Sequence, residues 1–194
     1  MLGQMALISL GSNKKSAIGD AAATIVYGLR ELLPLVRGEM RISSFYATPA
    51  FPLGAGPDFV NAAVAFDTDL TAAEILAALH RIEAAADRTR DIRWGQRTLD
   101  LDLVALGDQV LPDADVQLHW RDLPPVAQAR LAPDQLILPH PRVQDRSFVL
   151  VPLADVAPDW LHPLLGLSVA QMLNNLSAED RASVVPLPRP ADIP

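Results

Sequence analysis

The spacing of apolar and polar residues predicts alternating strands and helices in the first half of the chain. Residues 6–10 form a short apolar run that stops at a Gly-Ser-Asn cluster, which is typical of a buried strand followed by a turn. Apolar residues then recur every three or four positions over residues 18–32, as on one helix face, and Pro34 ends this helix. Residues 36–48 and 59–66 have strand-like patterns.

The next stretch repeats the alternation of helix and strand. Thr71 and Glu74 have the spacing of a capping box, so we expect a helix to begin there and to end near Asp87. Residues 98–106 form the clearest strand pattern in the chain. The order is therefore β-α-β-β-α-β, which predicts an α+β protein with a ferredoxin-like βαββαβ core.

The C-terminal third is richer in proline and less periodic. Residues 112–139 predict a surface loop with a short helix, and residues 145–153 and 168–176 predict additional C-terminal helices. We expect one domain over residues 1–176 and a proline-rich tail over residues 177–194.

Composition excludes several classes of protein. The 194 residues carry 16 basic and 23 acidic side chains, a formal charge of −7, which argues against non-specific nucleic-acid binding. The chain has no cysteine, so disulfides and thiolate sites are excluded. No apolar run approaches the roughly 18 residues of a membrane span. We expect a cytoplasmic monomer that binds small molecules rather than nucleic acid or membrane.

Two carboxylates stand out in the strand predicted over residues 98–106. Side chains alternate along a strand, so Asp100 and Asp102 share one face, about 7 Å apart, while Leu101 lies on the other. Two such carboxylates repel each other unless a cation lies between them, and Mg²⁺ prefers oxygen ligands together with substrate phosphates. The alternative is a strand edge that carries two solvated aspartates.

Arginines are concentrated just before these aspartates, in a chain that has only two lysines. They are Arg81, Arg88, Arg90, Arg93 and Arg97. Guanidinium groups bind phosphate oxygens through two parallel hydrogen bonds, so this cluster favours a polyphosphate ligand beside the metal. Surface ion pairs with Glu83, Asp87 and Asp91 are the alternative.

Two phenylalanines and an asparagine suit a flat heterocyclic ligand, and a histidine adds a candidate hydrogen-bond donor. Phe59 and Asn61 are two positions apart and therefore face the same side of a strand. Phe148 follows Arg146, and His140 is held between two prolines, where it can donate a hydrogen bond to a phosphate or a base. Both phenylalanines could equally be ordinary core residues, and His140 a structural histidine.

These residues occur in motifs that resemble those of the 6-hydroxymethyl-7,8-dihydropterin pyrophosphokinase family over roughly residues 6–153. Besides the segment 93–103, the motifs are Leu10-Gly11-Ser12-Asn13, Ser43-Ser44-Phe45-Tyr46-Ala47-Thr48-Pro49, Phe59-Val60-Asn61-Ala62-Ala63-Val64, Arg81-Ile82-Glu83 and Leu138-Pro139-His140-Pro141-Arg142. The resemblance implies a ferredoxin-like fold and Mg²⁺-dependent transfer of pyrophosphate from ATP to the pterin alcohol, with AMP as the other product, in folate biosynthesis.

The resemblance also implies three sets of site residues. Asp100 and Asp102 are expected to hold two Mg²⁺ ions, with Arg90 and Arg97 completing the catalytic set. The residues expected to contact ATP are His80, Glu83, Arg88, Arg90, Trp94, Arg97, Leu103, His140 and Arg146. The residues expected to contact the pterin are Thr48, Pro49, Phe51, Phe59, Asn61, Trp94 and Phe148.

The chain departs from the family pattern at four places. Gln96 replaces a common proline, Asp91 stands where a basic residue can occur, and His80 replaces a frequent glutamine. Residues 112–135 resemble an insertion relative to short members. Two other functions stay open: another Mg²⁺-dependent transferase that uses a nucleotide, and a ferredoxin-like module without catalysis.

Overall fold

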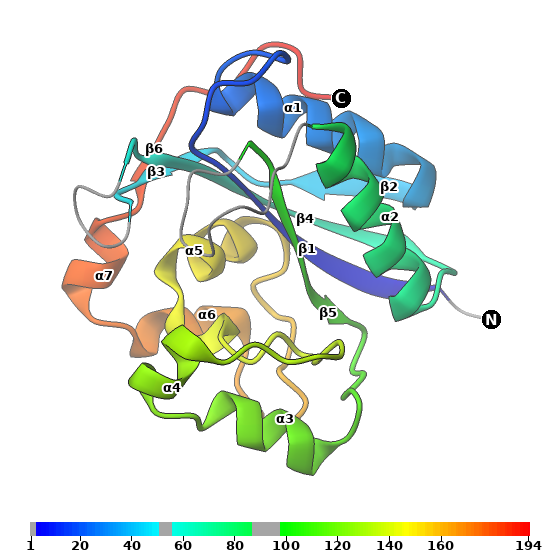
Figure 1. Ribbon diagram of the computed structural model, residues 1–194, viewed down its shortest axis with the longest axis vertical. Coiled ribbons are helices and arrows are strands. Elements are labelled where there is room, and N and C mark those ends of the chain that lie inside the picture. Colours follow the sequence, from blue (N-terminus) through cyan, green and yellow to red (C-terminus); the bar gives the residue numbers. More distant parts are fainter. Residues whose placement is uncertain (1–2, 51–55, 87–97) are drawn as a thin grey trace.

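A six-stranded antiparallel sheet lies at the centre of the computed structural model, which describes residues 3–50, 56–86 and 98–194 (Figure 1). The strands follow the order β5-β1-β4-β3-β6, and β2 also pairs with β4. Their bounds are β1 (Gln4–Ser12), β2 (Arg37–Ile42), β3 (Tyr46–Thr48), β4 (Phe59–Thr68), β5 (Asp100–Leu106) and β6 (Val185–Pro186). The prediction of a mixed α+β protein is confirmed.

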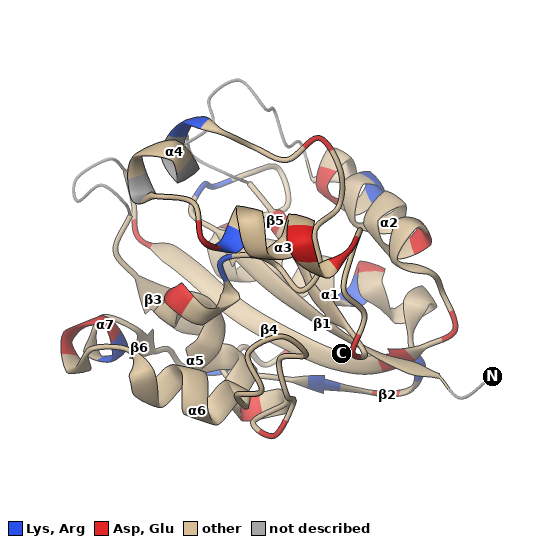
Figure 2. Ribbon diagram, turned by 90° about the horizontal axis from the view of Figure 1, so that it is seen from below, with Lys and Arg blue, Asp and Glu red and all other residues tan. Residues whose placement is uncertain are grey.

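Two helices cover one face of the sheet, α1 (Ala21–Leu32) and α2 (Ala72–Ala85) (Figures 1 and 2). Their apolar faces pack with Ile8, Val64 and Leu101 into one buried cluster. The capping box predicted at the start of α2 is present: the backbone N–H of Thr71 donates to Glu74 Oε2 over 2.8 Å, and the backbone N–H of Glu74 donates to Thr71 Oγ1 over 3.3 Å.

The other face of the sheet is covered by α5 (Ser147–Val156) and α6 (Val169–Asn175), which form a second buried cluster with Leu7, Ala63 and Val104 (Figure 2). Helices predicted over residues 145–153 and 168–176 are therefore confirmed within a few residues. In the described part of the chain, no helix has both the length and the apolar character that crossing a membrane requires.

The strand predicted over residues 36–48 is interrupted, because Ser43 is a buried bridging residue between β2 and β3. Its backbone N–H donates to the carbonyl of Ala63 over 3.0 Å, and its hydroxyl oxygen accepts from the N–H of Ala63 over 2.9 Å. A side chain thus takes one place in the ladder, and the regular pairing stops for three residues. The strand predicted over residues 98–106 is β5, which begins at Asp100.

Residues 112–139 contain two short helices where the sequence predicts one, α3 (Ala114–Arg121) and α4 (Pro125–Arg130). A short 3-10 helix, η1 (Leu33–Leu35), follows α1. Another, η2 (Val143–Asp145), precedes α5.

The predicted tail, residues 177–194, packs onto the sheet. It forms α7 (Ala178–Ala182) and β6, which pairs with β3, and the N–H of Leu187 donates to the carbonyl of Phe45 over 2.8 Å. Beyond Leu187 the tail has no regular helix or strand, as its prolines predict.

Candidate active site

The site is built where β1 ends between its two neighbours. Gly11 of β1 lies opposite Asn61 of β4 on one side and opposite Asp100 of β5 on the other. Residues directly opposite one another in a sheet share a face, so Asn61 and Asp100 project to the same side, about 10 Å apart across the glycine. A Cβ atom at Gly11 would lie 3.4 Å from Asn61 Oδ1 and 4.0 Å from Asp100 Cβ. The missing side chain leaves room the size of a methyl group between them.

Two buried residues after Gly11 tie neighbouring segments to the end of β1. The hydroxyl of Ser12 donates to the carbonyl of Thr98 over 2.6 Å, and the Asn13 side-chain amide donates to the carbonyl of Pro57 over 3.1 Å. Thr98 leads into β5 and Pro57 leads into β4. The Gly-Ser-Asn motif therefore fixes the starts of both strands that carry the candidate site residues.

The alternation predicted for β5 is confirmed. Leu101 and Leu103 are each 4% exposed and belong to the cluster beneath α1 and α2, whereas Asp100 and Asp102 are partly exposed on the opposite face. Within residues 3–50, 56–86 and 98–194, no three His, Cys, Asp or Glu side chains group as a metal site. Two carboxylates on one strand still fit Mg²⁺, because this ion often takes only one or two carboxylates and completes its octahedron with water and phosphate.

Two hydrogen bonds cover the open edge of β5, which is the last strand of the sheet on this side. Glu83 of α2 is 2% exposed, and its Oε1 accepts from the backbone N–H of Leu101 over 2.8 Å. The backbone N–H of His140 donates to the carbonyl of Val104 over 2.8 Å. The first contact fixes the backbone between the two aspartates, and the second brings His140 beside the same strand.

His140 is held in one protonation state and one tautomer. Burial lowers its pKa to about 3, with a further contribution from the positive charges of Arg146 and Arg142, so the imidazole is neutral at neutral pH. Its Nδ1 accepts from the backbone N–H of Arg142 over 3.1 Å. The proton of the neutral ring is therefore on Nε2, which makes this atom a hydrogen-bond donor.

A pocket of about 620 Å³ is lined by all the predicted nucleotide contacts that the structure describes. Its lining includes both predicted metal ligands and five predicted ATP contacts, namely Asp100, Asp102, His80, Glu83, Leu103, His140 and Arg146. The pocket is also lined by Trp120, Leu123 and Leu131, which the sequence does not indicate as site residues.

The predicted pterin contacts lie around β3 and β4. Thr48 pairs with Phe59 in the sheet, and the Asn61 amide donates to Thr48 Oγ1 over 2.8 Å between two buried side chains. A Cβ at Gly11 would also lie 3.9 Å from Phe59 Cδ1, so Phe59 and Asn61 share a face as predicted. Phe148, at the start of α5, is 39% exposed, and the centroid of its ring lies 5.6 Å from the guanidinium carbon of Arg146. Pro49 is exposed.

Several predicted residues lie outside the described part of the chain. They are Phe51, Arg88, Arg90, Asp91, Arg93, Trp94, Gln96 and Arg97.

Three residues at the site, Gly11, Arg142 and Trp120, are not predicted from the sequence as site residues. The role of Gly11 follows from a motif that the sequence does display, since a glycine inside a strand often marks a close approach. The only sequence feature that points to Arg142 is its position two residues after His140. Trp120 carried no local signal beyond being an isolated aromatic residue.

The family model for 7,8-dihydro-6-hydroxymethylpterin-pyrophosphokinase (HPPK) matches residues 7–158. Two relatives are named 2-amino-4-hydroxy-6-hydroxymethyldihydropteridine pyrophosphokinase. The one from Pseudomonas aeruginosa is 39% identical over 162 residues, covering 82% of this chain and 85% of that protein. The one from Synechocystis sp. is 35% identical over 172 residues, covering 88% of this chain and 75% of that protein.

A solved structure shares the fold. It is a variant of Plasmodium falciparum HPPK-DHPS with pterin and p-hydroxybenzoate, which matches with a TM-score of 0.60 at 15% sequence identity. The match covers 89% of this chain and 43% of that longer chain. At this identity the similarity establishes the fold alone.

Proposed function

Because the chain belongs to the 7,8-dihydro-6-hydroxymethylpterin-pyrophosphokinase family, a family of pyrophosphokinases in folate biosynthesis, we propose that it transfers pyrophosphate from ATP to 6-hydroxymethyl-7,8-dihydropterin. The hydroxyl oxygen of the pterin bonds to the β-phosphorus of ATP while the bond to the α,β-bridging oxygen breaks. AMP leaves with the bridging oxygen, and the hydroxyl proton passes to solvent.

The observation that carries this proposal is the row Asn61–Gly11–Asp100 across three adjacent strands. It sets the side chains of Asn61 and Phe59 on β4 beside a carboxylate pair on β5, with only the glycine between them. Two substrates held on either side of Gly11 would meet there, and mutual orientation of two reactants lowers the barrier to a bimolecular step.

We assign Mg²⁺ to Asp100 and Asp102, with two ions as the expected number. When bound, Mg²⁺ neutralises phosphate oxygens as negative charge moves onto the bridging oxygen of the leaving AMP. The protein's part is to keep both carboxylates on one face of β5. Glu83 supports this arrangement through its hydrogen bond to the N–H of Leu101.

The nucleotide contacts are assigned to the pocket beside β5. The neutral His140 donates from Nε2, and Arg146 supplies a positive charge for phosphate oxygens. Leu103, His80 and Glu83 line the same pocket. The assignments of Arg88, Arg90, Trp94 and Arg97 to ATP, with Arg90 and Arg97 in the catalytic set, rest on the family motif.

The pterin contacts are assigned to the β3–β4 side of Gly11. Asn61 and Thr48 offer hydrogen-bonding groups next to the ring of Phe59, which suits a flat heterocycle with donors and acceptors on its edge. Phe148 supplies a second aromatic face. Pro49, Phe51 and Trp94 are assigned to this pocket from the family motif.

We also assign the core to the ferredoxin-like class and residues 1–176 to one domain, with residues 112–135 as an insertion. The order β5-β1-β4, with β2 also paired to β4, supports this assignment, because it interleaves the units β1-α1-β2 and β4-α2-β5.

The test of this function separates nucleotide products after incubation with ATP, Mg²⁺ and 6-hydroxymethyl-7,8-dihydropterin. We expect AMP and the pterin pyrophosphate in equal amounts, and AMP only when the pterin is present. ADP as the product would indicate ordinary phosphoryl transfer, and inorganic pyrophosphate or a nucleoside diphosphate would favour a different Mg²⁺-dependent transferase. The absence of any Mg²⁺-dependent turnover would favour a module without catalysis.

Gly11→Ala is expected to lower kcat/KM for the pterin on the order of tenfold. The added methyl group would occupy the space between Asn61 and Asp100 in which the two substrates meet. Its contacts of 3.4 to 4.0 Å are ordinary van der Waals distances, so the fold should tolerate it. Steady-state kinetics with each substrate varied in turn, together with thermal unfolding, checks this expectation.

Gly3→Ala is the matched control for Gly11→Ala. Gly3 lies just before β1, far from the site, and an added Cβ there would also meet its neighbours at 3.5 to 3.8 Å. The control should keep full activity. Equal activity of the two variants would show that the space at Gly11 is not used by the substrates.

A further inference from the structure

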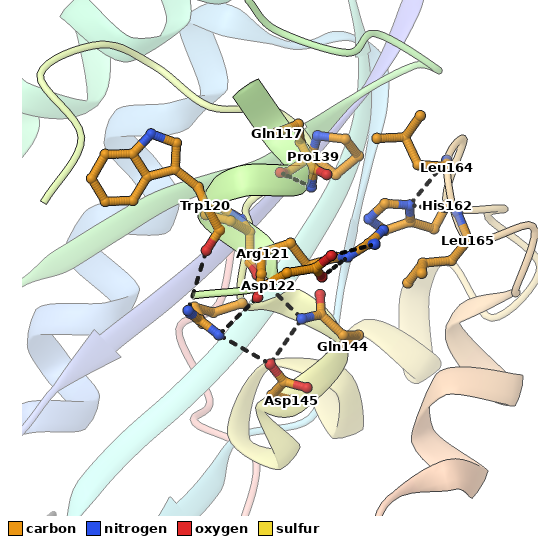
Figure 3. Close-up of polar contacts among 12 residues, drawn as sticks. Gln117, Trp120, Arg121, Asp122, Pro139, Gln144, Asp145, His162, Leu164 and Leu165 are labelled. Atoms are coloured by element: carbon orange, nitrogen blue, oxygen red, sulfur yellow. Dashed lines mark hydrogen bonds and ion pairs between the residues drawn. The ribbon is translucent and has the colours of Figure 1, made fainter. Parts of the chain in front are cut away.

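The segment 112–135 is joined to the segment that holds His140 by several hydrogen bonds. At its start, Leu111 and Leu138 exchange backbone hydrogen bonds of 2.9 and 3.1 Å. Within α3, the buried Gln117 donates from its side-chain amide to the carbonyl of Pro139 over 3.2 Å (Figure 3). Helix α3 is therefore fixed relative to the wall of the pocket beside β5.

Arg142 clamps the last turn of α3. Its guanidinium donates to the carbonyl of Trp120 over 3.2 Å and to the carbonyl of Arg121 over 3.3 Å, and its side chain is only 13% exposed. The last carbonyls of a helix lack partners within the helix and carry partial negative charge, so a cation stabilises this end. Because Arg142 follows His140 by two residues, the clamp sets the position of Trp120 relative to His140.

The side chains of Trp120 and Arg121, at the end of α3, point in different directions. In Figure 3 the side chain of Arg121 lies next to His162. The ring of Trp120 projects to the opposite side. Trp120 instead lines the pocket that also contains Asp100, His140 and Arg146. Leu123 and Leu131 of the same segment line this pocket as well. Apart from Asp134 and Gln135, the side chains that this segment contributes to the pocket are apolar or aromatic, whereas the opposite side carries Asp100, His140 and Arg146.

We propose that the segment 112–135 forms the base-binding wall of the nucleotide pocket, with the indole of Trp120 in contact with the adenine of ATP. This inference rests on the proposed function. Among the described side chains that the segment contributes to the pocket, none is cationic, and Asp134 is acidic. The guanidinium of Arg142 at this end is already bound by the carbonyls of Trp120 and Arg121 and by Asp145, so phosphates would be drawn instead to Arg146 and to the metal on β5. The aromatic end is left for the adenine base, because every base has a π-face that can stack on an indole ring.

Trp120→Ala tests the contact directly. We expect the Kd of the Mg²⁺ complex of α,β-methylene-ATP, measured by calorimetry, and the KM for ATP to rise about tenfold, with kcat changed less than twofold. Trp120→Phe keeps an aromatic face and should stay within about threefold of the wild type. Val126→Ala, at a residue of α4 that is 68% exposed and does not line the pocket, should behave as the wild type.

Unchanged nucleotide affinity in Trp120→Ala would overturn the proposal, as would an equal loss in the Phe and Ala variants, because stacking predicts a difference. Trp120→Leu keeps apolar bulk without a ring and should resemble the Ala variant; it decides the question if Trp120→Ala does not fold. Binding of the analogue does not require turnover. If the wild-type protein bound it but formed no AMP with the pterin, the proposed function would fail while the contact was still tested.

Discussion

Asp100→Asn and Asp102→Asn should each reduce AMP formation on the order of a thousandfold. Each substitution removes a negative oxygen ligand from the face of β5 on which the Mg²⁺ ions are assigned, and Lewis-acid stabilisation of a transferring phosphoryl group amounts to several kcal/mol. Asparagine has nearly the shape of aspartate, so packing against β1 should be kept. Initial rates at several Mg²⁺ concentrations measure the loss and show whether excess metal recovers part of it.

A matched control distinguishes loss of a metal ligand from general loss of charge. Asp67 is an exposed carboxylate at the other end of the same sheet, where it pairs with Met5, so Asp67→Asn should keep full activity. Calorimetry adds a readout besides turnover, since Mg²⁺-dependent binding of α,β-methylene-ATP should weaken in the Asp100 and Asp102 variants only. Wild-type rates in either of these variants would remove that residue from the metal site.

The elements that sequence predicts best are those specified by local chemistry. The capping box of Thr71 and Glu74 needs only residues three apart, and the alternation of aspartate and leucine in β5 needs only neighbours on one strand. The interruption at Ser43 could not be predicted in this way. It depends on a hydrogen-bonded partner, Ala63, that is twenty residues distant.

The site also contains features that local sequence predicts and features that depend on contacts between distant segments. Residue type and neighbours make Asp100, Asp102 and His140 candidates, the family resemblance supplies their expected roles, and the structure places all three around one pocket. The register that sets Gly11 between Asn61 and Asp100 is a property of three strands, so no single segment contains it. Glu83 illustrates the same limit: its hydrogen bond to the N–H of Leu101 follows from β5 being an edge strand. The position of Trp120 depends likewise on the docking of α3 through Arg142.

His162 makes folding sensitive to pH outside the candidate site. It is fully buried in the loop before α6, and its Nδ1 accepts from the N–H groups of Leu164 and Leu165 over 3.2 and 3.3 Å. Its Nε2 is buried and makes no hydrogen bond to any described residue. Burial, followed by the positive charge of Arg121, lowers the pKa of His162 to about 4, because a charged ring cannot be solvated there.

The direction of the pH effect follows from this lowered pKa. Well above pH 6.5 the ring is neutral in both the folded and the unfolded chain, so the full stability is present. As the pH falls from 6.5 towards 4, the unfolded chain binds a proton that the folded chain does not bind, and the free energy of unfolding decreases. For His162 this loss should reach about 2 kcal/mol at pH 5 and about 3 kcal/mol near pH 4.

His162→Asn should remove this part of the pH dependence, because the Asn side-chain oxygen can accept from the same loop N–H groups and does not titrate. Urea unfolding at pH 7.5 and pH 5 measures it: the wild type should lose about 2 kcal/mol more than the variant between the two values. His140 is present in both proteins, so its own low pKa cancels in the comparison. His119→Asn, at an exposed histidine, is the control and should keep the wild-type slope. If the wild type and His162→Asn lost equal stability, protonation of His162 would not be what limits folding in acid.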